Sequence, residues 1–350
     1  MSSTSPSYLL AEAPGKNHGL FATRPIATGE LVISEAPLFT AQGLFEVGPA
    51  VQRLSAAEKV VFEALTDAYC PDKPTPVTRF KTNALPLGVG STLGGLFPQI
   101  SRINHSCRPN VHHSWCEKLG KEVIYASSPI AQGEEILTTY LEPYASTEER
   151  RRILVNDFRF VCRCDVCERA DPANDALRKK IAQLGDEILY TSRRDPIGGL
   201  RLAKERLRSM EEEGSGDPAE YSVTHYDAYQ TCIAVSDLEA AKRHMGLAYA
   251  YRLLSEGPDS AEIPRNLALY RNPGSHPATG MHGRRVMPGI CDGCGKEAVG
   301  GGGDGGKKGK GTAKVLVCEG CKCAIYCDKE CQAKHRAWHE AACSVAGRLR

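Results

Sequence analysis

Cysteine is the residue type whose number and spacing most clearly indicate chemistry in this chain of 350 residues. Most of its 15 cysteines fall within residues 162–167 and 291–343. The first segment reads Cys162-x-Cys164-x2-Cys167, which supplies three thiolates where a structural zinc ion takes four ligands. In a reducing compartment disulfides are rare, and closely spaced thiols there usually bind metal. We therefore interpret both segments as metal sites.

Two other strings carry side chains suited to binding and orienting a small molecule. They are Asn104-His105-Ser106-Cys107-Arg108-Pro109-Asn110 and Gly133-Glu134-Glu135-Ile136-Leu137-Thr138-Thr139-Tyr140. An asparagine side chain offers both a donor and an acceptor. Alone, the first string would indicate a hydrogen-bonded turn, and Tyr140 alone would indicate a core residue. Their order along the chain is what favours a functional site.

The composition is that of an ordinary globular protein, with 41% hydrophobic and 25% charged residues. The length predicts roughly two or three domains. A net charge of only +2 gives no general reason to expect binding to nucleic acid or a membrane surface. No apolar run approaches the roughly 20 residues of a spanning helix, and the N-terminus lacks the pattern of a signal peptide. We expect the protein in the nucleus, the cytoplasm or both.

The elements that would position these side chains are strand-rich in the first part of the chain. Residues 8–40 and about 77–141 have the pattern of strands joined by turns. Between them, residues 50–68 have helical spacing, and Ser55 with Glu58 predicts a capping box.

Beyond the second strand-rich block the pattern becomes helical. Ser146 and Glu149 have the spacing of another capping box, for a helix over residues 148–155. Further helical periodicity, which packed antiparallel helices would satisfy, covers Ala176–Leu189, Leu200–Met210, His225–Val235 and Asp237–Leu254. A loop is expected at residues 211–216. The glycines and lysines within residues 299–312 predict a flexible, disordered insertion.

In this order the strings resemble the core of a SET domain, the fold of most protein-lysine methyltransferases. An N-terminal string, Gly15-Lys16-Asn17-His18-Gly19-Leu20-Phe21-Ala22, resembles the family's first cofactor-binding turn. The expected fold class is α+β: a β-rich SET core with a zinc-bound post-SET segment, a helical, tetratricopeptide-like region and a small C-terminal MYND zinc finger. The expected boundaries are 8–145 for the SET domain with a helical insert at about 48–95, 146–170 for the post-SET segment, 171–272 for the helices, 273–290 for a linker and 291–343 for the finger.

The resemblance implies S-adenosylmethionine as the cofactor. The positions expected to surround it are Lys16, His18, Gly19, Asn83, Ser101, Asn104, His105, Tyr140 and Phe160. Gly19 would allow a close backbone approach, and Phe160 could stack on a planar base. Because this cofactor is already a strong methyl donor, catalysis would consist mainly of alignment and delivery of a neutral lysine amine. Desolvation beside the cationic cofactor would lower the pKa of that amine, and Tyr140 would orient it.

One position departs from the pattern of the family. Relatives often place a tyrosine two residues before the phenylalanine that corresponds to Phe160, where it lines the lysine channel. This chain has Phe158 there, which we assign with Tyr140 to the catalytic position. The lost hydroxyl would lower the rate, change the number of methyl groups added or be replaced by another group, and these alternatives stay open.

The resemblance also completes the metal sites. Cys107 is expected to join Cys162, Cys164 and Cys167 around one zinc ion. The C-terminal segment has the ligand spacing of a MYND finger, and its eight ligands imply two further ions. Because the ligand pairs of that family interleave, the expected sets are Cys291, Cys294, Cys327 and Cys331 for one ion and Cys318, Cys321, His339 and Cys343 for the other.

Two residues of the finger, Cys323 and His335, are surplus to these sets. His335 lies four residues from both Cys331 and His339, so it is an alternative ligand. MYND fingers commonly bind proline-rich peptides, which is the role we expect here, and a purely structural cap is the alternative. The finger usually interrupts the SET domain, whereas here it follows the helices.

These resemblances predict an S-adenosylmethionine-dependent N-methyltransferase that acts on lysines of histone or non-histone proteins. The alternative is a SET-MYND scaffold with weak turnover that recruits proline-rich partners, and Phe158 is its support in the sequence. A DNA-binding zinc protein is disfavoured because the chain lacks a basic recognition helix. We expect neither membrane association nor sequence-specific nucleic-acid binding.

Overall fold

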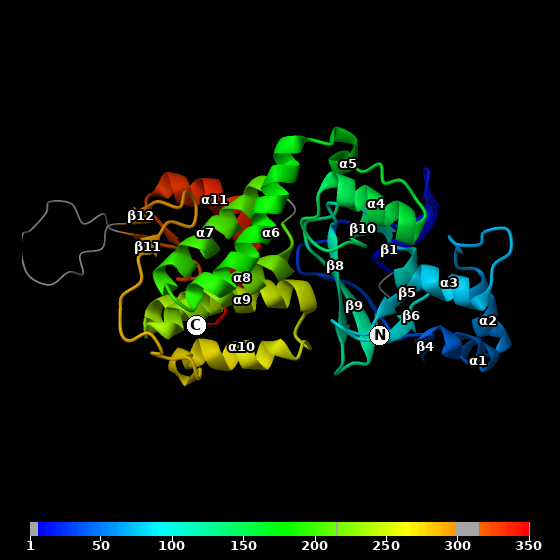
Figure 1. Ribbon diagram of the computed structural model, residues 1–350, viewed down its shortest axis with the longest axis horizontal. Helices are drawn as coiled ribbons and strands as arrows, with labels where there is room; N and C mark the ends of the chain where they lie inside the picture. Colours follow the sequence, from blue (N-terminus) through cyan, green and yellow to red (C-terminus); the bar gives the residue numbers. More distant parts are fainter. Residues whose placement is uncertain (1–5, 215, 299–314, 350) are drawn as a thin grey trace, which may run out of the picture. The chain divides into compact units, whose positions relative to one another are not determined.

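The computed structural model describes residues 6–214, 216–298 and 315–349, so the insertion predicted at 299–312 lies outside the described residues. The chain divides into two compact units. The first contains the residues up to 175 together with 255–260, and the second contains the remainder. Strands dominate the first unit and helices the second (Figure 1). The predicted α+β class is therefore confirmed.

The described strands of the first unit form small sheets with the orders β1-β2-β10-β7, β3-β9-β8 and β4-β6-β5. Their bounds are β1 (Tyr8–Ala13), β2 (Asn17–Ala22), β3 (Leu31–Glu35), β4 (Phe39–Gln42), β5 (Ala84–Pro86), β6 (Leu93–Leu96), β7 (Asn104–His105), β8 (Val111–Cys116), β9 (Lys121–Ala126) and β10 (Glu135–Thr138).

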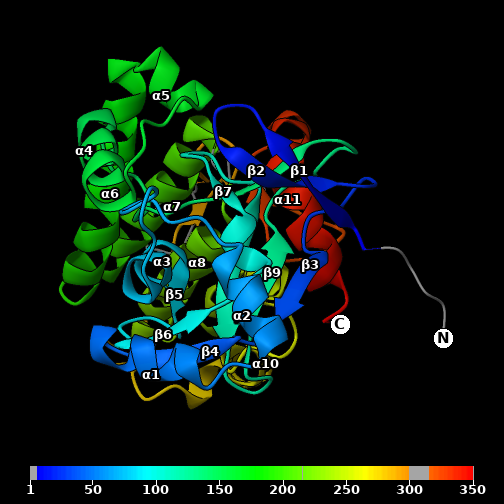
Figure 2. The ribbon, with the colours of Figure 1, turned by 90° about the vertical axis from the view of Figure 1, so that its right-hand side faces the viewer.

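Strand β10 lies between β2 and β7 and thereby positions the candidate site. It pairs antiparallel with β2, where Glu135 faces Phe21, and parallel with β7, where Thr138 faces His105. Two strings that are far apart in the sequence thus flank the strand that leads to Tyr140, and their strands β2 and β7 are labelled near each other in Figure 2. Apolar side chains beneath these strands form the core of the unit, and fully burying each large one contributes about 1.5–3 kcal/mol. They include Leu20, Ile26, Ile33, Phe97, Ile103, Val111, Ile124 and Ile136.

The helices of the first unit are α1 (Val47–Gln52), α2 (Ala56–Glu63), α3 (Pro76–Asn83), α4 (Thr147–Phe158) and α5 (Asp165–Arg169), with 3-10 turns at Leu44–Glu46 and Ile100–Arg102. The capping box of Ser55 and Glu58 is present and starts α2. It also explains why the helix predicted at 50–68 is two helices, since the N-cap residue has an extended backbone. At α4, the Ser146 side chain accepts from the Glu149 N–H, which is half of the predicted box.

The second unit contains the long helices α6 (Pro172–Ser192), α7 (Pro196–Glu213), α8 (Pro218–Ala234), α9 (Leu238–Glu256) and α10 (Glu262–Arg271) and a 3-10 turn at Pro273–Ser275. These are followed by β11 (Gly289–Ile290), β12 (Glu297–Ala298), β13 (Leu316–Val317), β14 (Ile325–Tyr326) and α11 (Lys329–Gly347). The helical core is built from Leu200, Ala203, Ala228, Tyr229, Ile233, Ala241, Met245 and Ala248. None of the described helices is long and apolar enough to span a bilayer.

The loop predicted at 211–216 is partly wrong, because helix α7 continues to Glu213. Gly214 ends it with a φ of 81°, a backbone conformation that glycine adopts without strain. The Glu211 carboxylate interacts with His335, and the buried Glu213 carboxylate lies 3.6 Å from the Arg178 guanidinium. These tertiary partners hold acidic residues in a helix that their local sequence would end earlier.

Candidate active site and metal clusters

Tyr140 follows strand β10, and its hydroxyl is held inside the first unit. The hydroxyl donates a hydrogen bond of 2.7 Å to the carbonyl oxygen of Ile103. Burial, and next the negative charge of Glu135, raise the pKa of Tyr140 well above its usual range. The phenol is therefore protonated at neutral pH. Because its one hydrogen is donated to Ile103, the hydroxyl oxygen can accept a further hydrogen bond at a fixed position.

Three further rings surround Tyr140. The ring centroids of His105 and Phe158 lie 5.2 and 5.1 Å from that of Tyr140, and Phe160 meets it edge-on at 6.3 Å. Between the two phenylalanines, Arg159 ends α4 in the left-handed conformation with a φ of 65°. The structure thus brings the predicted residues Tyr140, Phe158, Phe160 and His105 into one aromatic group.

Glu135 organises the predicted residues on the other side of β10. Its carboxylate accepts from the Lys16 ammonium at 2.8 Å and from the Asn104 amide nitrogen at 2.8 Å. The same amide donates to the carbonyl oxygen of His18 at 2.9 Å. A side chain at Gly19 would place its Cβ 2.7 Å from the Glu135 carboxylate and 2.8 Å from the Asn104 amide. Glycine is required here because the two polar groups occupy that space.

The sequence alone predicts no role for Glu135, although the residue lies within the string 133–140. The sequence feature that indicates such a role is an acidic residue in a strand-like string, because Lys16 and Asn104, both predicted for the same site, can donate to a carboxylate. Only the pairing of β10 with β2 and β7 shows that one carboxylate reaches both partners.

Asn83 and Ser101 contact each other and the adjoining backbone. The Ser101 hydroxyl interacts with the carbonyl oxygens of Asn83 and Phe97, at 2.9 and 2.6 Å. The Asn83 amide donates to the carbonyl oxygens of Thr66 and Arg79, each at 2.7 Å. These bonds fix the end of α3 against the turn that precedes Asn104.

The thiols of Cys107, Cys162, Cys164 and Cys167 form the first metal cluster, with all four sulfurs within 4.8 Å of one another. The Cys107 and Cys167 sulfurs are 3.4 Å apart, too far for a disulfide of about 2.05 Å. A tetrahedral zinc ion with bonds of about 2.3 Å would separate its sulfur ligands by about 3.8 Å. Hydrogen bonds with the Cys107 and Cys162 thiols lower the pKa of Cys167 to about 6, which favours the thiolate. The donor set fits zinc.

His105 lies between this cluster and Tyr140. Its Nδ1 accepts a hydrogen bond of 3.0 Å from the backbone N–H of Tyr140, and its Nε2 lies 3.3 Å from the Cys107 sulfur. The resemblance placed His105 beside the cofactor. The structure directs both ring nitrogens to groups of the protein itself.

The finger brings together the two ligand sets expected from the family. Sulfur–sulfur distances are 3.6 Å for Cys294 and Cys327 and 3.6 Å for Cys318 and Cys343. Both sets keep their ligand atoms within 4.8 Å and therefore also fit tetrahedral metal sites. They are Cys291, Cys294, Cys327 and Cys331, and Cys318, Cys321, His339 and Cys343.

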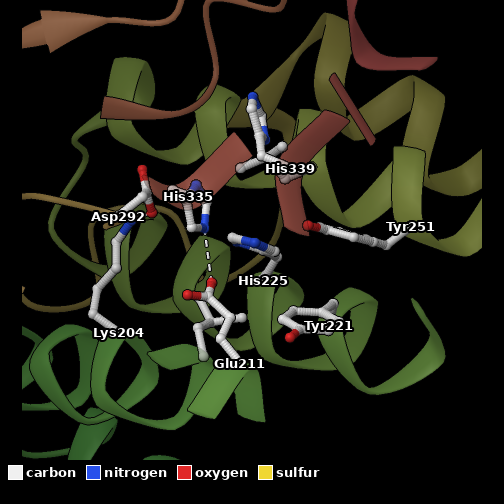
Figure 3. A pocket seen from close by; sticks show the side chains of 10 residues that line it. Lys204, Glu211, Tyr221, His225, Tyr251, Asp292, His335 and His339 are labelled. Carbon is white, nitrogen blue, oxygen red and sulfur yellow. Dashed lines mark hydrogen bonds and ion pairs between the residues drawn. The ribbon is translucent and has the colours of Figure 1, made fainter. Parts of the chain in front are cut away.

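The surplus residue His335 is not positioned as a ligand. Its Nδ1 lies 2.9 Å from the Tyr326 hydroxyl, and its Nε2 lies 2.7 Å from the Glu211 carboxylate on α7 (Figure 3). The alternative that His335 replaces a zinc ligand is therefore wrong, since its two nitrogens contact a tyrosine of the finger and a helix of the same unit.

A second buried interaction joins the finger to α7. Lys204 and Asp292 form an ion pair whose side chains are both 5% exposed, and Figure 3 shows them pointing toward each other. Asp292 also accepts from the Ile325 N–H at 2.7 Å. By contrast, the pair of Arg201 with Glu297 lies at the surface. The finger is thus fixed to the helices of the second unit by polar groups close to its metal ligands.

Comparison with known proteins supports both parts of this description. The SET domain model matches residues 17–141, and the MYND finger model matches residues 291–343. The histone-lysine N-methyltransferase set5 of Schizosaccharomyces pombe is 32% identical over 278 residues, which cover 77% of this chain and 85% of that protein.

Other relatives match shorter regions. The histone-lysine N-methyltransferase SET5 of Saccharomyces cerevisiae is 28% identical over 165 residues, covering 44% of this chain and 31% of that protein. The human N-lysine methyltransferase SMYD2 is 31% identical over 113 residues, covering 32% of this chain and 25% of that protein. Since all three are named as methyltransferases, the alternative of a scaffold with weak turnover is not favoured. The chain belongs to the family of SET and MYND domain-containing protein-lysine methyltransferases.

Proposed function

We propose that this methyltransferase modifies lysines of histones, with S-adenosylmethionine bound beside β10 and with Tyr140 orienting the lysine amine. The observation that carries the site assignment is the register of β10, which gathers Gly19, Asn104 and Tyr140 from separate segments. Histones are the proposed substrate because the relative that covers most of the chain is named as a histone-lysine enzyme. Non-histone proteins are the second substrate class, since human SMYD2 is named more broadly as an N-lysine methyltransferase.

The residues around Glu135 suit the recognition of a charged amino-acid group. When bound, S-adenosylmethionine would supply an activated methyl group on a cationic sulfur. The Lys16 ammonium would attract the carboxylate of the cofactor. The Asn104 amide nitrogen donates to Glu135 and to the His18 carbonyl, so its Oδ1 would accept from the ammonium of the cofactor. Gly19 leaves its backbone accessible. His18, Asn83 and Ser101 complete the proposed set, and the Phe160 ring would stack on the base.

The aromatic group suits the delivery of a neutral amine. Tyr140 is a protonated phenol whose position is fixed by Ile103, and its oxygen would accept from an N–H of the amine. Phe158 presents a ring without a hydroxyl beside it, so the walls of the proposed channel are apolar at this point. An apolar wall disfavours the charged ammonium and lowers the pKa of the lysine. Alignment of the amine and exclusion of water are therefore the main tasks of these residues.

We further propose three zinc ions, one in each cysteine-rich cluster. The support is the separation of the ligand atoms and their number, which matches tetrahedral sites. The finger is proposed to bind proline-rich segments of partner proteins through the surface that does not face the helices. For localisation we propose the nucleus, where histones are found, together with the cytoplasm.

Tyr140→Phe tests the proposed function directly. We expect kcat for methyl transfer to fall about 100-fold, as when other positioned hydrogen-bonding groups are removed, while cofactor affinity changes little. Radiolabelled cofactor with purified histones measures the rate, and mass spectrometry of an extract treated with either protein identifies the modified lysines.

Tyr190→Phe is the matched control, because this exposed tyrosine belongs to the helical unit. It should transfer methyl groups at the wild-type rate. Unchanged kcat in Tyr140→Phe would contradict the proposed role of Tyr140. Absence of any transfer by the wild-type protein to histones or to the extract, despite cofactor binding, would contradict the proposed function.

A further inference from the structure

His105 is placed to connect the first cysteine cluster with the backbone at Tyr140. The side chain is 4% exposed and lies on β7, the strand beside β10. One ring nitrogen faces the Tyr140 backbone and the other faces the Cys107 sulfur, at 3.0 and 3.3 Å. A single imidazole therefore contacts a proposed metal ligand and the residue proposed to orient the substrate.

The two contacts determine which nitrogen carries the proton. A backbone N–H can only donate, so Nδ1 must be the unprotonated nitrogen that accepts from Tyr140. In the neutral ring Nε2 then carries the hydrogen and points it at the Cys107 sulfur. Hydrogen bonds of this kind to metal ligands hold them in orientation.

Packing fixes the plane of the ring. The His105 ring centroid lies 5.2 Å from that of Tyr140 and 5.9 Å from that of Phe160. The two neighbouring rings and the two contacts of its nitrogens restrict rotation of the imidazole. A change in the position of Cys107 would consequently be transmitted through a stiff group to the peptide bond before Tyr140.

We propose that His105 is a positioning residue that couples the geometry of the four-cysteine cluster to Tyr140, rather than a side-chain ligand of the cofactor. This inference rests on the proposed function, because the purpose of the coupling is to hold the Tyr140 hydroxyl where the amine is oriented. It assigns a chemical role to each nitrogen, so the two roles can be separated by substitution.

Two variants separate them. In His105→Asn, the amide oxygen can occupy the place of Nδ1, so the bond from the Tyr140 N–H is retained and the contact to Cys107 is lost. In His105→Gln, the longer side chain can place its amide nitrogen where Nε2 lies, so the Cys107 contact is retained and the Tyr140 bond is lost. His113→Gln on β8 is the matched control, since His113 pairs with Glu122 instead.

Three measurements on the full chain distinguish the variants. Zinc release to a chromogenic chelator should be about 10-fold faster for one ion in His105→Asn, and unchanged in His105→Gln. Hydrogen exchange at the Tyr140 amide should accelerate only in His105→Gln. The kcat for methyl transfer should fall by up to about 100-fold in His105→Gln, since a displacement of about 1 Å in a positioned group costs that much, whereas the KM for S-adenosylmethionine should stay near the wild-type value in both variants. His113→Gln should match the wild type in all three.

The inference is overturned if both variants raise the KM for S-adenosylmethionine at unchanged kcat, because His105 would then act on the cofactor. It is also overturned if zinc release and Tyr140 exchange both stay at wild-type values in both variants. Should the wild-type protein transfer no methyl groups, the proposed function fails. Zinc release and amide exchange need no turnover and still decide whether His105 forms the coupling. If one variant does not fold, the other still tests its own half of the assignment.

Discussion

The two metal-binding regions of this protein use the same ligand types but are connected to their surroundings differently. The cluster of the first unit joins Cys107 to a later cysteine segment, and its neighbour His105 reaches the backbone of Tyr140. The finger of the second unit reaches the helices through charged side chains, Lys204 with Asp292 and Glu211 with His335. One metal region is thus linked to Tyr140, a residue of the proposed active site, and the other to the helices of the second unit.

This difference indicates that similar zinc sites can have different tasks within one chain. A metal that fixes a peptide bond next to Tyr140 should affect the rate of the reaction. A metal that shapes a surface for ion pairs with α7 should affect the stability of the second unit. Removing each connection separately tests whether the two regions differ in this way.

The largest effect is expected from removing a ligand of the first cluster. Cys164→Ser should lose one zinc ion and lower the rate of methyl transfer by more than about 100-fold. Mutation of a residue that only hydrogen-bonds to a metal ligand already lowers metal affinity or activity by about 10–100-fold. Zinc content and transfer from labelled cofactor measure the two effects. Cys294→Ser, at an exposed ligand position of the finger, is the counterpart.

Cys294→Ser should also lose one zinc ion, while the folded protein keeps a rate near that of the wild type. Equal losses of activity in Cys164→Ser and Cys294→Ser would show that the two regions do not have separate tasks. A Cys164→Ser protein that keeps its rate after losing zinc would show that the first cluster is not coupled to Tyr140.

The next effect concerns the buried ion pair of the finger. Lys204→Met leaves the Asp292 carboxylate buried without its cation, and breaking such a pair costs about 3–5 kcal/mol. We expect this loss in the free energy of unfolding of the second unit, measured by urea titration, with little change in kcat for the molecules that remain folded. A large fall in kcat at unchanged stability would contradict the assignment of the finger to the helices of the second unit.

Features that depend on near neighbours in the sequence could be predicted. The capping box at Ser55 and Glu58 needs only a spacing of three residues, and it is present. The finger thiols come in closely spaced pairs, and the two members of a pair can bind the same metal ion independently of the fold of the rest of the chain. The structure brings the expected ligand sets together. The contribution of Cys107 came from resemblance to the family, because nothing local connects it to Cys162.

Features that depend on tertiary pairing could not be predicted. Lys204 and Glu211 look like ordinary charged residues of a helix, yet each meets a partner in the finger. Glu211 was even placed in a loop, since its acidic neighbours and Gly214 indicate a helix end when the partner is unknown. Glu135 is similar, because its two partners, Lys16 and Asn104, are reached only through strand pairing.

The smallest effect is expected at the surface pair that accompanies the buried one. Arg201 and Glu297 also join α7 to the finger, but their side chains are 55% and 39% exposed. Water and salt screen such a pair, so its contribution to stability is slight. Arg201→Met should therefore change the urea midpoint by a small fraction of the change seen in Lys204→Met, and 1 M salt should remove even that difference. The Lys204→Met effect should persist in salt because its charges are shielded from the solvent.

If both variants lost stability equally, or if salt abolished both effects, the attachment of the finger would be a general attraction between charged surfaces. If only the Lys204→Met effect persists, the buried pair contributes much more to the attachment than the exposed pair, although both pairs join the finger to α7.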